Sequence, residues 1–136
     1  MRQEDITEII IHCAATPEGV NFDINDIRKW HVDERGWSDV GYHYIILLDG
    51  TIQKGRPTNK QGAHCLGHNG NSIGVCYIGG VDKYSKSKDT RTDAQKVALK
   101  ALVFMIKDQF KTISSVHGHN EFSKKACPSF DVSKEF

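Results

Sequence analysis

The stretch Glu8-Ile-Ile-Ile-His-Cys13 decides the fold of this chain. Three consecutive isoleucines without alternating polar residues predict a strand buried on both faces, which is typical of parallel sheets in α/β proteins. His12 ends this apolar run, and a polar side chain there must find a partner. Because α/β sheets place functional residues at the ends of buried central strands, the same stretch also indicates a candidate site.

Further strands are expected on either side of this one. Apolar runs predict strands over residues 42–48 and 72–78, and a short strand over 113–117. Asp49-Gly50 predicts a hairpin turn into a strand over 51–54. The segment 57–71 is rich in Gly and Asn and has no periodicity, so it is expected to be a long loop.

Two helices complete the expected elements. Residues 21–35 predict an amphipathic helix that is capped by Asp23 or Asn25 and ended by Gly36. Thr92 and Gln95 form a capping-box pattern at the start of a second helix over 92–110. Its expected apolar stripe consists of Val97, Leu99, Leu102, Val103 and Ile106. The first helix should pack through Ile24, Ile27, Trp30 and His31.

Strands that interleave with helices, with no internal repeat or linker, predict a single α/β domain over residues 1–136. The expected architecture is a central mixed β-sheet flanked by helices. Hydrophobic residues make up 38% and charged residues 26% of the chain, which is typical of a globular protein. The net charge of +1 gives no electrostatic case for a nucleic-acid partner.

No membrane or secretory segment is expected either. The longest apolar run, residues 101–106, is far too short to span a bilayer. The N-terminus has no apolar core of a signal peptide, so we expect synthesis in the cytoplasm. The four cysteines show no CxxC spacing, and we expect reduced thiols.

A cluster of reactive side chains lies between His117 and Phe130. It contains His117, His119, Lys125 and Cys127. Neutral imidazoles and a thiolate suit Zn²⁺, and a nearby ammonium suits a developing oxyanion. Spacing alone does not choose between His117 and His119, and a further ligand must come from another segment or be water. His12 is the strongest candidate among the remaining histidines.

A series of motifs resembles one enzyme family. In chain order they are Ile-Ile-His-Cys-Ala-Ala-Thr (10–16), Ile-Arg-Lys-Trp-His (27–31), Gly-Trp-Ser-Asp-Val-Gly-Tyr-His-Tyr (36–44), Asp-Gly-Thr (49–51), Gly-Ala-His (62–64), Asn-Ser-Ile-Gly-Val-Cys (71–76) and the segment 119–130. The chain resembles the zinc-dependent N-acetylmuramoyl-L-alanine amidases of phage endolysins and peptidoglycan-recognition proteins, most of all those of short-tailed coliphages. Each motif is weak alone, but together they run in family order along nearly the whole chain.

The resemblance implies one zinc ion per chain, in a groove on one face of the domain, with His12, His119 and Cys127 as ligands. It therefore selects His119 over His117. It also implies that Tyr42 and Lys125 are required for catalysis. A residual positive charge and an open fourth position would lower the pKa of a bound water from about 16 towards about 7. We assign proton handling jointly to Tyr42 and this water.

The implied reaction is hydrolysis of the amide bond between N-acetylmuramic acid and L-alanine in peptidoglycan. His64 matches a family position that lines the substrate groove. Asn69, Asn71 and His68 share its loop and are further candidates for binding the stem peptide or sugar. Arg56 and Trp37 are candidates on thinner grounds, and Trp37 is expected to pack against the sheet. We expect a monomer that acts on the cell wall after release from the cytoplasm.

Three alternatives stay open at this level. A relative that has lost its cysteine ligand acts as a peptidoglycan receptor, but here Tyr42, Lys125 and Cys127 are all present. A structural zinc site would show four closely spaced protein ligands, whereas these come from distant segments. A coliphage relative also binds its phage RNA polymerase, but no motif marks such a surface here, and we do not expect this partner.

Overall fold

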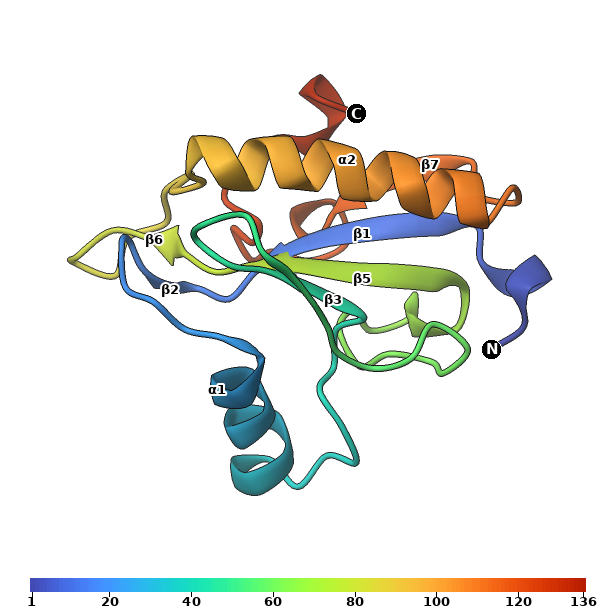
Figure 1. Cartoon of the computed structure of the whole chain (residues 1–136), viewed down its shortest axis with the longest axis horizontal. Helices are drawn as coiled ribbons and strands as arrows, with labels where there is room; N and C mark the ends of the chain where they lie inside the picture. Colours follow the sequence, from blue (N-terminus) through green and yellow to red (C-terminus); the bar gives the residue numbers. More distant parts are fainter.

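The computed structural model describes residues 1–136 and contains a five-stranded sheet with a helix on each side (Figure 1). The strand order is β4-β3-β5-β1-β7, and only the β3–β4 pair is antiparallel. This mixed sheet confirms the predicted fold class. The strands are β1 (Glu8–Cys13), β3 (Tyr44–Ile46), β4 (Ile52–Lys54), β5 (Ser72–Tyr77) and β7 (Ser115–Gly118).

The strand β1 is buried along its whole length, as predicted, and lies between β5 and β7. Alternate side chains of β1 enter different layers. Ile9, Ile11 and Cys13 belong to the main hydrophobic core. Ile10 and His12 therefore point to the opposite face of the sheet, and we call this side the site face.

The main core is closed by α2 (Asp93–Gln109), which runs along the sheet in Figure 1. The predicted capping box is confirmed, since Thr92 Oγ1 accepts from Gln95 N–H and Gln95 Oε1 accepts from Thr92 N–H. The assignment of Val97 to the apolar stripe is wrong, because its side chain is 70% exposed. Residues two positions from a buried helical site, as Val97 is from Leu99, point about 200° away from it.

The first helix differs from the prediction. The α-helix α1 covers only Ile24–Arg28, and a π-helical turn follows over Lys29–Glu34. Asp23 rather than Asn25 caps it, and Gly36 follows the turn in the left-handed region with φ of +74°. Hydrophobic periodicity does not distinguish α from π geometry over one turn, so the change of helix type could not be predicted from the apolar pattern.

The remaining differences concern element ends and short pieces. The strand expected over 42–48 is regular only within β3, and β7 begins two residues later than predicted. A short parallel pair, β2 (Thr16–Pro17) with β6 (Gly80–Val81), was not predicted, because two-residue strands have no periodicity. No helix is both long and apolar enough to cross a membrane. Single 3₁₀ turns cover Gln3–Asp5, Asn69–Asn71, His119–Glu121 and Val132–Lys134.

Candidate metal centre

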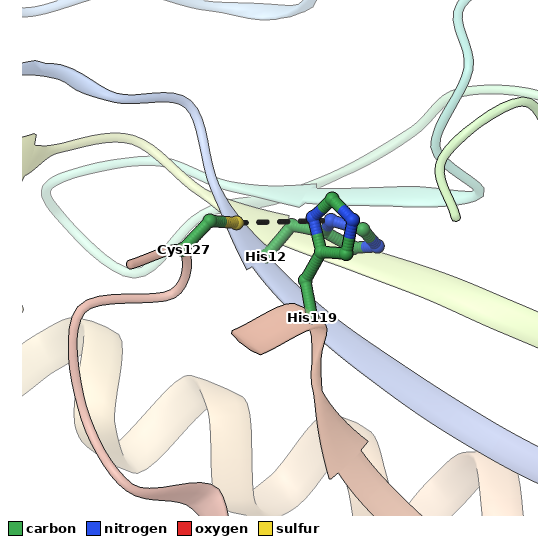
Figure 2. A group of neighbouring side chains, drawn as sticks. All are labelled: His12, His119 and Cys127. Carbon is green, nitrogen blue, oxygen red and sulfur yellow. Dashed lines mark hydrogen bonds between the residues drawn. The ribbon is translucent and has the colours of Figure 1, made fainter. Parts of the chain in front are cut away.

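Three side chains from distant segments converge at one end of β1 (Figure 2). They are His12, His119 and Cys127, and one ligand atom of each lies within 4.8 Å of the other two. His12 Nδ1 lies 3.8 Å from Cys127 Sγ. His12 is only 1% exposed, whereas His119 and Cys127 are partly exposed. The group therefore has a buried side and a side that solvent can reach.

The sheet register explains why His119 joins this group. β1 and β7 pair in parallel with Ile11 opposite Gly118, so His12 and His119 follow at the same level. Their rings have centroids 4.7 Å apart. His117 lies opposite Ile10, two residues before the level of His12, and its Nδ1 pairs with Glu121 Oε1 at 2.9 Å. The structure thus places His119 in the group and His117 outside it.

The chemistry of these donors fits a zinc ion. Burial, together with the nearby His64 and His119, lowers the pKa of His12 well below its usual value and favours a neutral imidazole. Without a cation, the hydrogen bond with Cys13 and burial raise the pKa of Cys127. A bound cation would reverse this effect by stabilising the thiolate. A tetrahedral zinc would hold a nitrogen and a sulfur about 3.5 Å apart, close to the 3.8 Å between His12 Nδ1 and Cys127 Sγ.

A cavity of about 600 Å³ opens over this group. This volume suits a small-molecule or peptide ligand. The three candidate ligands contribute to its wall, together with four other residues predicted for the site: Tyr42, His64, Asn69 and Lys125. The structure therefore gathers most of the predicted site around one cavity.

Tyr42 and Lys125 differ in their surroundings. The ring of Tyr42 lies 5.2 Å from that of His12, and burial raises the pKa of its phenol well above the usual value. Tyr42 therefore stays protonated at neutral pH and can donate a hydrogen bond into the cavity. Lys125 is exposed at the wall, and its charge adds to burial in lowering the pKa of His119.

His64 and Asn69 line the cavity, but both also have partners within the protein. His64 Nδ1 bonds His12 Nε2 at 2.8 Å, and its Nε2 bonds Ser72 Oγ at 3.2 Å. Burial, followed by nearby positive charge, lowers the pKa of His64 to about 3. The side-chain oxygen of Asn69 accepts from the backbone N–H groups of His64 and Cys65, so it shapes the loop that carries His64.

Three of the predicted candidates lie outside the cavity wall. His68 pairs with Glu8 at 2.8 Å and stacks on Phe122, so it fastens the 57–71 loop to the sheet. Asn71 donates to Thr7 Oγ1. Arg56 donates to the carbonyls of Val40, Asp39 and Gln61. Their polar atoms hold loops in place.

Some residues of the cavity wall were not predicted as binding residues. His31 was expected only to pack, yet it faces the cavity beside Trp37, which was a candidate on thinner grounds, with their rings 4.6 Å apart. Arg35 lies over Trp37, and Leu66 is 95% exposed at the rim. No Asp or Glu lines the cavity, although the chain has 17. The absence of acidic residues from the cavity depends on how distant segments come together in the fold, so no local sequence pattern predicts it.

A comparison with known proteins agrees with this arrangement. The family described as N-acetylmuramoyl-L-alanine amidase matches residues 2–130. This chain belongs to that family. The amidase is 41% identical to the endolysin of Escherichia phage T7 over 133 residues, which is 98% of this chain and 87% of the endolysin.

Solved structures with the same fold agree with the assignment. The amidase LysC from Clostridium intestinale aligns with 96% of this chain and 81% of its own, at a TM-score of 0.80 and 27% identity. A Drosophila PGRP-LB variant in complex with tracheal cytotoxin aligns with 90% of this chain and 75% of its own, at a TM-score of 0.76 and 26% identity. The present chain is therefore an N-acetylmuramoyl-L-alanine amidase with the fold it shares with peptidoglycan-recognition proteins.

Proposed function

We propose that this amidase depends on one zinc ion held by His12, His119 and Cys127. The ion would serve hydrolysis of the bond between N-acetylmuramic acid and L-alanine. One observation carries the proposal: the three candidate ligands converge in the wall of a cavity that Tyr42 and Lys125 also line. Three protein ligands leave a fourth position open, as in catalytic rather than structural zinc sites.

When bound, the zinc ion supplies a Lewis acid that activates water near neutral pH and polarises a carbonyl. The protein supplies the remaining groups. Tyr42 lines the cavity as a neutral phenol and donates a hydrogen bond to the carbonyl oxygen as negative charge develops there. The Lys125 ammonium stabilises the same charge from the exposed side of the cavity.

The charge of the cavity fits the stem peptide of peptidoglycan, which carries free carboxylates. Arg35 and Lys125 line the cavity and no acidic residue does, so an anionic peptide meets only favourable charge there. Asn69 lies on the same wall and could contact the peptide backbone. We propose that His68 and Asn71 hold the loop that carries His64 and Asn69 in place, because their side chains already bond Glu8 and Thr7.

We further propose that residues 1–136 form one domain that acts as a monomer on the cell wall. All the assigned groups come from a single sheet and its loops, so the site needs no second chain.

Digestion of purified peptidoglycan, followed by mass analysis of the products, tests the proposed function. The untreated protein should release free stem peptides. Chelator should abolish this release, and added zinc should restore it. Release of disaccharide fragments instead would show that a different bond is cleaved. If metal analysis finds no zinc in a protein that is still fully active, the proposed zinc site is wrong.

A further inference from the structure

The unusual feature of the site is that a candidate ligand bonds another histidine. His12 Nε2 lies 2.8 Å from His64 Nδ1, while His12 Nδ1 faces Cys127 Sγ. In most metal sites the second ring nitrogen of a histidine ligand donates to a carboxylate, a backbone carbonyl or water. A histidine partner can donate or accept, so the direction of this bond decides which nitrogen of His12 carries the proton.

Ser72 determines that direction. Ser72 Oγ lies 2.6 Å from the backbone carbonyl of His68, which can only accept, so the single hydroxyl proton points there. The contact between His64 Nε2 and Ser72 Oγ, at 3.2 Å, must then use a proton on His64. A neutral imidazole carries only one such proton, so His64 Nδ1 is an acceptor. His12 consequently donates from Nε2, and its Nδ1 keeps a lone pair facing Cys127.

The position of the His64 ring is built into the sheet. A Cβ atom on Gly74 would lie 2.7 Å from His64 Cγ, and one on Gly62 would lie 2.6 Å from His64 Cδ2. Real Cβ atoms do not approach other atoms so closely, so two glycines leave the space that the ring fills. In β5, Gly74 and Ser72 share a face because they are two residues apart. The strand β5 therefore supplies both the space for the His64 ring, at Gly74, and the hydrogen-bond partner of its Nε2, Ser72.

We propose that His64 is a positioning residue that, held by Ser72, fixes His12 in the tautomer whose Nδ1 can bind zinc. The inference rests on the proposed zinc site and extends it to residues that do not touch the ion. The chain of bonds runs from His12 to His64, then to Ser72 and the His68 carbonyl. Without it, His12 would be free to place its proton on Nδ1 or to rotate, and the ligand lone pair would be lost for part of the time.

The first test uses the metal-free protein, so it does not depend on zinc binding. Nitrogen-15 NMR of labelled histidines at pH 7.5, after chelator treatment, reports which ring nitrogen of each histidine is protonated. The intact protein should show His12 with its proton on Nε2. In Ser72→Ala, where the His64 ring remains but its Nε2 partner is removed, His12 should show a mixture of tautomers.

The second test measures zinc affinity by competition with a chromogenic chelator. Loss of a residue that hydrogen-bonds a metal ligand lowers the affinity for the metal about 10–100-fold. We expect this loss for His64→Ala and a smaller one for Ser72→Ala. His64→Asn should recover much of the affinity, because the Asn side-chain oxygen can replace the Nδ1 acceptor. Gly74→Ala should also weaken zinc, although it removes no polar atom, because it displaces the ring.

His31→Ala is the matched control. His31 is a buried histidine in the wall of the same cavity, but its Nδ1 accepts from Gly41 N–H and it has no bond to a candidate ligand. The zinc affinity of His31→Ala should stay within about twofold of that of the unmodified protein. Circular dichroism spectra and melting curves establish that each variant is folded before its affinity is compared.

The outcomes separate this inference from the zinc proposal. If the unmodified protein binds no zinc, the proposed function fails, while the tautomer measurement still tests the bond chain. If the unmodified protein binds zinc but folded His64→Ala and Ser72→Ala bind it equally well, the positioning role is wrong. A single Nδ1-protonated His12 in the metal-free protein would also overturn it.

Discussion

The Nδ1 atom of His12 lies 3.8 Å from the Sγ atom of Cys127, although 115 positions separate the two residues in the chain. His12 is the penultimate residue of the central strand β1, and Cys127 lies in the loop that follows β7 (Figure 2). The backbone N–H of Cys13 also donates to Cys127 Sγ at 3.2 Å. This bond stabilises negative charge on the sulfur and ties the loop to the end of β1.

Replacing the sulfur ligand should remove both metal and catalysis. We expect Cys127→Ser to bind zinc much more weakly and to lose at least about 100-fold in activity, since the ligand set is broken. Metal analysis and peptidoglycan digestion measure both effects. Cys65→Ala is the control, because Cys65 lines the same cavity but lies outside the ligand group. Full activity in Cys127→Ser would show that the ligands are assigned incorrectly.

Chelation should abolish turnover while leaving the protein folded. None of the candidate ligands belongs to the buried residues of the main core, and only His12 lies in a strand, close to the end of β1. The chain therefore does not need the ion to bury its apolar residues. We expect unchanged circular dichroism and a moderate fall in melting temperature after zinc removal. Cooperative unfolding on chelation would instead indicate a structural site.

Removing the Tyr42 hydroxyl should slow the reaction without loosening the metal. Loss of one donor to a developing oxyanion costs about 100–1000-fold in kcat. Tyr42→Phe should therefore show such a fall in kcat with little change in KM, zinc content or melting temperature. A change confined to KM would assign the hydroxyl to substrate binding.

Lys125 allows a comparison with its neighbour in the chain. Lys125→Met should lower kcat about 100-fold, because it removes positive charge beside the reacting carbonyl. Lys124→Met is the control, since Lys124 is also exposed but does not line the cavity. Equal activities in the two variants would remove Lys125 from the catalytic groups.

The metal-free protein should lose stability on mild acidification. Burial lowers the pKa of His31 to about 4 and that of His64 to about 3, whereas both are near 6.5 when unfolded. Below pH 6.5 the unfolded chain therefore binds protons that the folded chain does not. The free energy of unfolding falls down to about pH 4 through His31 and down to about pH 3 through His64. Urea titrations at several pH values measure this slope. His31→Asn keeps an acceptor for Gly41 N–H but removes one titrating group, so the free energy of unfolding should depend less steeply on pH, by the equivalent of one proton. An unchanged slope would show that His31 does not contribute to the pH dependence.

Local pattern was sufficient for much of this fold. The isoleucines before His12 predicted a buried central strand, and Thr92 with Gln95 predicted the start of α2, because both signals depend on neighbouring residues. The π-helical turn and the exposed position of Val97 were not predicted. Apolar content over one turn does not specify helix type, nor which apolar residues face the core.

The sequence by itself determined the kinds of donor available for a metal and, through ordered motifs, the amidase family. Only the tertiary structure decided how these groups meet. The parallel register of β1 with β7 brings His119 rather than His117 level with His12. Gly74 in β5 leaves the space in which His64 reaches both His12 and Ser72. Such contacts depend on strand order and register, which join residues too distant in the chain for any local pattern to encode.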